Sequence, residues 1–158
     1  MIDDNSVLFK YTSGANAGLI TRIVVTANGG FTDEGSPLAV TDIVGNYTAT
    51  ITIYDSEAEE IYTDTITFGF NADGTVKITY VCDKTNAYAV TPAYAGATAA
   101  ADKVTLRGDE LTVAATKNGT EYTFKFTVTD PLTRTELKLT ECPDLDDSEL
   151  SAGKTFVK

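Results

Sequence analysis

Two clusters of carboxylates are the residues of this chain with the greatest capacity for chemistry. They consist of Asp55, Glu57, Glu59 and Glu60 in one segment and of Asp144, Asp146, Asp147 and Glu149 in another. A glycosidase holds two carboxylates across a cleft and withdraws one of them from water. Both clusters fall in predicted turns, where water keeps a carboxyl group ordinarily acidic. We therefore interpret them as solvated charge rather than as catalytic groups.

Other reactive sites are excluded by the residue types present. The 158 residues contain no histidine, which removes histidine triads, histidine metal ligands and a histidine pH switch. The segment 144–149 offers oxygen ligands but lacks the glycine turn and the loop frame of an EF-hand. Cys82 and Cys142 are too few ligands for a zinc site, and the pattern leaves open whether they form a disulfide. We expect no enzymatic activity, no metal and no cofactor.

The charge of the chain argues against two classes of partner. The formal net charge is −11, from 23 acidic and 12 basic residues, and a field of this sign repels nucleic acids and anionic membranes. No apolar run approaches the roughly 18 residues of a membrane helix.

The 27 threonines and eight tyrosines are typical of bacterial extracellular modules. We expect an extracellular or cell-surface monomer whose parent protein carried a signal peptide.

Alternation of apolar and polar residues is the dominant structural signal. It runs through 47–53, 62–70, 76–82, 111–115 and 122–128, with threonine frequent on the polar side. The segments are joined by tight turns rich in asparagine and glycine, which tolerate a positive φ angle. This pattern predicts an all-β fold, an antiparallel meander of about eight strands that forms a barrel or a two-sheet sandwich.

Two segments resemble the opening of bacterial lipocalin-like or calycin-like domains: 43–57 (IVGNYTATITIYDSE) and 68–80 (FGFNADGTVKITY). In that family the first strand begins with Gly-x-Trp or Gly-x-Tyr, and a later hairpin reads Phe-x-x-Asp-Gly-Thr. The matching residues here are Gly45, Tyr47, Phe70, Asp73, Gly74 and Thr75. The resemblance implies a closed barrel with an internal cavity and a non-catalytic secreted role. It carries over no ligand residue.

The beginning of the chain resembles its end. Residues 8–12 match 123–127, and 20–26 match 132–140 with two inserted residues. A fainter match joins 152–156 to 44–48. These matches indicate a tandem array, although threonine-rich strands also resemble one another by chance.

The domain limits follow from these matches. We predict a main domain at 40–142, which the array interpretation expects to fold on its own from residue 42. The strand pair within 1–39 is then the tail of a preceding unit, or it extends the same sheet. Residues 143–158 are an acidic tail or the start of a next unit.

Tyr88 and Tyr94 are the candidate ligand-binding residues. They lie in a long alanine-rich connection at 86–101, and an aromatic ring on such a loop can stack on a sugar or anchor a protein. We therefore predict a non-catalytic binding or display module that contacts a glycan or a protein, as an adhesion module or as one unit of an array. The alternative is a calycin-like carrier of a small apolar ligand.

Overall fold

The computed structural model describes residues 6–10, 12, 20–25, 31–33, 39–55, 60–83, 91–129, 134–143 and 150–158. This part of the chain contains β-strands and two short 3-10 helices, and none of its helices is long and apolar enough to cross a membrane. The elements are β1 (Ser6–Lys10), β2 (Ile20–Val25), β3 (Phe31–Asp33), η1 (Val40–Ile43), β4 (Gly45–Asp55), β5 (Glu60–Phe70), β6 (Val76–Cys82), β7 (Thr98–Ala99), η2 (Ala101–Lys103), β8 (Val104–Arg107), β9 (Glu110–Lys117), β10 (Thr120–Val128), β11 (Glu136–Glu141) and β12 (Thr155–Val157).

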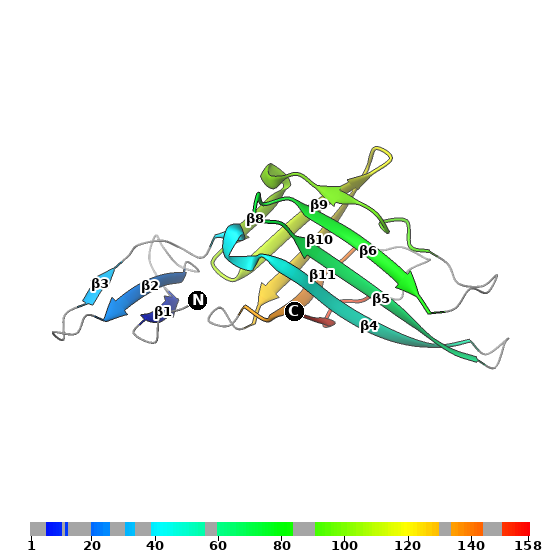
Figure 1. Ribbon diagram of the computed structural model, residues 1–158, viewed down its shortest axis with the longest axis horizontal. Coiled ribbons are helices and arrows are strands. Elements are labelled where there is room, and N and C mark those ends of the chain that lie inside the picture. Colours follow the sequence, from blue (N-terminus) through cyan, green and yellow to red (C-terminus); the bar gives the residue numbers. More distant parts are fainter. Residues whose placement is uncertain are drawn as a thin grey trace.

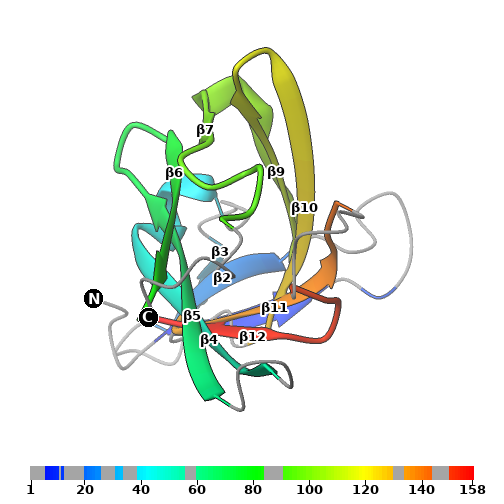
Figure 2. The same cartoon turned by 90° about the vertical axis from the view of Figure 1, so that its right-hand side faces the viewer.

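Eight strands close into an antiparallel barrel (Figures 1 and 2). Around the barrel the strands follow the order of the chain: β4, β5, β6, β7, β9, β10, β11 and β12. β12 then pairs with β4 and completes the circle. The extra strand β8 runs along the same edge of β9 as β7 does. The all-β prediction is confirmed, and of the two expected architectures the chain forms the barrel.

The barrel is closed by junctions of very different length. The hairpin of β4 and β5 pairs continuously from Gly45 opposite Phe70 to Asp55 opposite Glu60. In contrast, β12 and β4 are joined at one register position, Val157 opposite Thr48. The two-residue strand β7 bridges β6 and β9 in a similarly short way. The sheet is therefore continuous, but the number of paired residues differs greatly from one strand junction to another.

Aromatic rings fill the centre of the barrel. The ring of Phe68 meets those of Phe124, Phe126 and Phe156 edge-on, with centroids 5.0, 5.0 and 5.3 Å apart. All four side chains are fully buried. Edge-on contacts are a favoured arrangement of aromatic pairs, and the interior of an eight-stranded barrel is narrow enough for side chains to fill it.

The N-terminal strands form a sheet of their own. β1, β2 and β3 make a three-stranded antiparallel sheet with Val7 opposite Ile23 and Val24 opposite Thr32. The predicted pair within 1–39 is thus joined by a third strand and does not extend the barrel sheet. The tandem array stays a prediction.

The barrel extends beyond residue 142, the predicted limit of the main domain. β12 lies between β11 and β4, and its Phe156 is fully buried among the central rings. Leu150 is buried as well. Residues 150–158 therefore complete the barrel, and a domain ending at 142 would lack one of its strands. The faint match of 152–156 to 44–48 joins two segments of the same barrel.

Candidate functional site

The inner face of the barrel changes in burial from one end to the other. At the end covered by η1, the inward side chains are almost completely buried. At the opposite end, beside the long hairpin of β4 and β5 (Figure 1), most inward side chains are partly accessible to solvent, whereas Asp64 is buried among them. We call this part of the inner face the mouth. It consists of Ile51, Ile53, Tyr62, Asp64, Tyr80, Cys82 and Tyr122.

Asp64 is the buried charged residue of the mouth. Its residue is 6% exposed, and it occupies the inward position of β5 directly opposite Ile51 on β4 and Cys82 on β6. The hydroxyl group of Tyr80 donates a hydrogen bond to Oδ1 of Asp64 over 2.8 Å. Within the described part of the chain, no lysine or arginine forms an ion pair with this carboxylate. Burial of a carboxylate is unfavourable unless hydrogen bonds or charges compensate for lost water.

The environment of Tyr80 keeps its phenol protonated. Burial raises the pKa of Tyr80, and the hydrogen bond and charge of Asp64 raise this pKa further, because a phenolate beside a carboxylate would place two negative charges together. Cys82 adds a smaller effect in the same direction. At neutral pH the tyrosine is therefore a fixed donor to Asp64.

A pH dependence of stability follows from the raised pKa of Tyr80. An unfolded phenol ionises near pH 10, whereas the folded one stays neutral to higher pH. The contribution of Tyr80 to stability is thus complete below about pH 10 and declines above it, by at most about 1.4 kcal/mol per pH unit. Urea unfolding followed by circular dichroism between about pH 8 and pH 11 should show a shallower decline in Y80F. An unchanged decline in Y80F would contradict this, and Y54F, whose ring is exposed, is the control.

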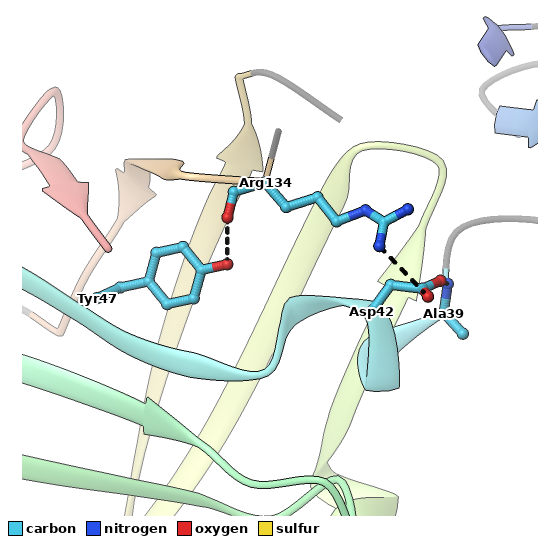
Figure 3. Close-up of polar contacts among 4 residues, drawn as sticks. All are labelled: Ala39, Asp42, Tyr47 and Arg134. Carbon is cyan, nitrogen blue, oxygen red and sulfur yellow. Dashed lines mark hydrogen bonds and ion pairs between the residues drawn. The ribbon is translucent and has the colours of Figure 1, made fainter. Parts of the chain in front are cut away.

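The opposite end of the barrel is held closed by a set of polar contacts (Figure 3). The hydroxyl group of Tyr47 donates to the backbone carbonyl of Arg134 over 2.6 Å. Nη1 of Arg134 lies 3.6 Å from Oδ1 of Asp42, whose Oδ2 accepts a hydrogen bond from the backbone of Ala39. Burial raises the pKa of Tyr47, and the charge of Arg134 opposes this shift. The ammonium group of Lys158 lies 5.9 Å from the centre of the Tyr47 ring.

The structure corrects the expectation for Tyr94. Its residue is 1% exposed, and its ring meets those of Phe124 and Tyr122 edge-on, with centroids 5.3 and 6.5 Å apart. The backbone after it pairs with β6, because the amide of Gly96 donates to the carbonyl of Ile78. This pairing draws the ring into the barrel, so Tyr94 is not an exposed sugar-stacking or protein-anchoring residue. Tyr88 lies outside the described residues.

The other candidate groups do not form a site in the described part of the chain. Asp144, Asp146, Asp147, Glu149, Glu57 and Glu59 lie outside it, as do the side chains of Asp55 and Glu60. Among the described residues there is no group of three side chains able to hold a metal ion. Cys82 and Cys142 are not joined by a disulfide, and Cys142 donates to the carbonyl of Leu150.

The mouth contains a residue that the sequence analysis missed. Asp64 shares the inward side of β5 with Ile66, Phe68 and Phe70. A charged residue on an otherwise apolar face was therefore visible in the alternation. Its position is hard to recognise because Thr63 and Thr65 flank it, so that three successive residues are polar.

The comparisons with known proteins add no relative. No protein-family profile matches the chain, and no match was found among curated proteins or solved structures. The closed eight-stranded antiparallel barrel is compatible with a calycin-like barrel. That is a statement about the fold alone.

Proposed function

We propose that this chain is a non-catalytic binding module, secreted or displayed at the cell surface, which takes its ligand at the mouth of a filled barrel. The proposal rests on the difference in composition between the centre of the inner face and the mouth. Aromatic rings fill the centre, whereas the mouth contains three partly accessible tyrosines and the buried residue Asp64. Binding pockets typically combine apolar and aromatic walls with a few polar groups that fix orientation.

The same observation disfavours a carrier that encloses an apolar ligand. The space at the centre is taken by Phe68, Phe124, Phe126 and Phe156. A ligand placed there would have to displace rings that contact one another, and the cost of such repacking opposes binding. The barrel is compatible with the lipocalin-like or calycin-like resemblance. Its filled centre disfavours the internal cavity that this resemblance implies.

Mapping of fragment binding by NMR tests this proposal. We expect small molecules to shift the methyl and ring signals of the mouth residues, such as Ile51 and Tyr122, while the signals of Phe68 and Phe126 stay unchanged. Shifts centred on Phe68 and Phe126 would instead favour an enclosed apolar ligand. Shifts at neither place, across charged and neutral fragments, would contradict a binding role for the inner face.

A further inference from the structure

We infer that the mouth selects an organic cation of the substituted-ammonium class, with Asp64 as its counter-charge. This inference rests on the proposed function, because it requires that ligands bind at the mouth. It goes further by naming the chemical class. Three properties of the described residues lead to it: a charge at Asp64 with no ion pair among them, the tyrosines Tyr62 and Tyr80 beside it, and the consequence of covering it.

The charge of Asp64 has no cationic partner in the described part of the chain. One oxygen accepts the hydrogen bond from Tyr80 over 2.8 Å, and among the described residues no ion pair includes the carboxylate. Charges interact more strongly where water is partly excluded. The overall charge of −11 also raises the local concentration of cations around the chain. Both effects favour a positively charged ligand.

The tyrosines of the mouth provide the surface that organic cations prefer. Tyr62 precedes Asp64 by one inward position on β5, and the hydroxyl group of Tyr80 donates a hydrogen bond to Asp64. The ring of Tyr122, on β10, packs against Tyr94. Aromatic faces attract ammonium groups, and groups of such rings bind quaternary ammonium ions. A metal ion is less suited to this place, since hard cations require several oxygen ligands.

The free-energy cost of covering the mouth is lower for a cation than for other ligands. Any occupant that fits between these side chains removes water from Asp64. A neutral apolar molecule leaves the carboxylate without compensation, and an anion adds repulsion. An ammonium group replaces the lost water with a charge-assisted hydrogen bond. The mouth should therefore bind an amine more tightly than its neutral analogue.

Calorimetric titration with phenethylammonium and with phenethyl alcohol, its neutral analogue, tests the inference. We expect the ammonium compound to bind at least about tenfold more tightly. Replacement of Asp64 in D64N keeps the shape and an acceptor for Tyr80. It should abolish this preference, because it weakens binding of the ammonium compound and removes the cost of covering a charge when the alcohol binds. The matched control is D83N, which removes a carboxylate from the outside of the same sheet, where Asp83 accepts from the Thr63 amide.

Cys82 provides a second readout at the site itself. In the C142S background it is the single thiol, because the chain has two cysteines, and bound phenethylammonium should slow its alkylation by iodoacetamide. If D64N does not fold, as judged by circular dichroism, Y62L carries the test. The loss of one aromatic face should weaken binding of the ammonium compound more than binding of the alcohol, and so reduce the preference.

The outcomes distinguish the inference from the function on which it rests. Equal affinity for both compounds, or full retention of the preference in D64N, overturns the choice of a cation. If the alcohol nevertheless protects Cys82, the mouth remains a binding site. If neither compound protects Cys82 and no fragment shifts the mouth residues, both proposals fail.

Discussion

Replacement of Phe68 by alanine is expected to lower the free energy of unfolding by about 3–5 kcal/mol. Its ring is fully buried and makes three edge-on contacts, with Phe124, Phe126 and Phe156, so the substitution leaves a cavity at the centre of the barrel. The two strands that carry these partners, β10 and β12, lose a shared contact. Urea unfolding followed by circular dichroism measures the change, and the size of the loss is a large fraction of the stability of a typical domain.

The control for this substitution lies on the outside of the same sheet. Val81 is an exposed residue of β6, and V81T keeps its branched shape. We expect V81T to change the free energy of unfolding by no more than about 0.5 kcal/mol. A loss below about 1 kcal/mol in F68A would show that the interior relaxes around the cavity, and it would contradict a tightly packed centre.

Removal of residues 150–158 is expected to abolish the folded barrel altogether. This deletion takes away β12 with the buried Phe156 and the buried Leu150. It also leaves β11 and β4 with unpaired edges, which favour aggregation. We expect the shortened chain to lose cooperative thermal unfolding and to elute as aggregates in size-exclusion chromatography.

The matched control removes a longer segment from the other end. A chain that begins at Ala39 lacks the separate sheet of β1, β2 and β3 but keeps the contact between Ala39 and Asp42. Its barrel should unfold within a few degrees of the full chain. Cooperative unfolding of the chain that ends at residue 149 would contradict the role of β12 and restore the domain limit at residue 142.

Local alternation predicted the long strands because it depends on residues two positions apart. The inward residues of β4, β5, β6 and β10 were visible in this way, and so was the choice of an all-β fold. Alternation does not locate β7 and β12, because they contain two and three residues. Segments this short become strands only through their neighbours, Ala99 opposite Val76 and Val157 opposite Thr48.

The candidate site was predictable to a smaller extent. Tyr94 was assigned to the surface because the segment around it lacks alternation, whereas pairing of Gly96 with Ile78 turns the ring inward. This pairing is a tertiary contact that composition does not reveal. Asp64 could have been found from its position on an apolar face. Its partner Tyr80 could not, because the register between β5 and β6 determines which side chains meet across the sheet.

The single register position between β12 and β4 has a consequence for mechanical load. The barrel begins with β4 and ends with β12, and Val157 lies opposite Thr48, so both ends of the barrel leave from the side covered by η1. Tension applied to these ends pulls two neighbouring antiparallel strands apart sideways. Backbone hydrogen bonds then break one after another, as in a zipper, rather than all together as in shear. In a surface array built from such units, single barrels would unfold at low force, and the array would lengthen under tension.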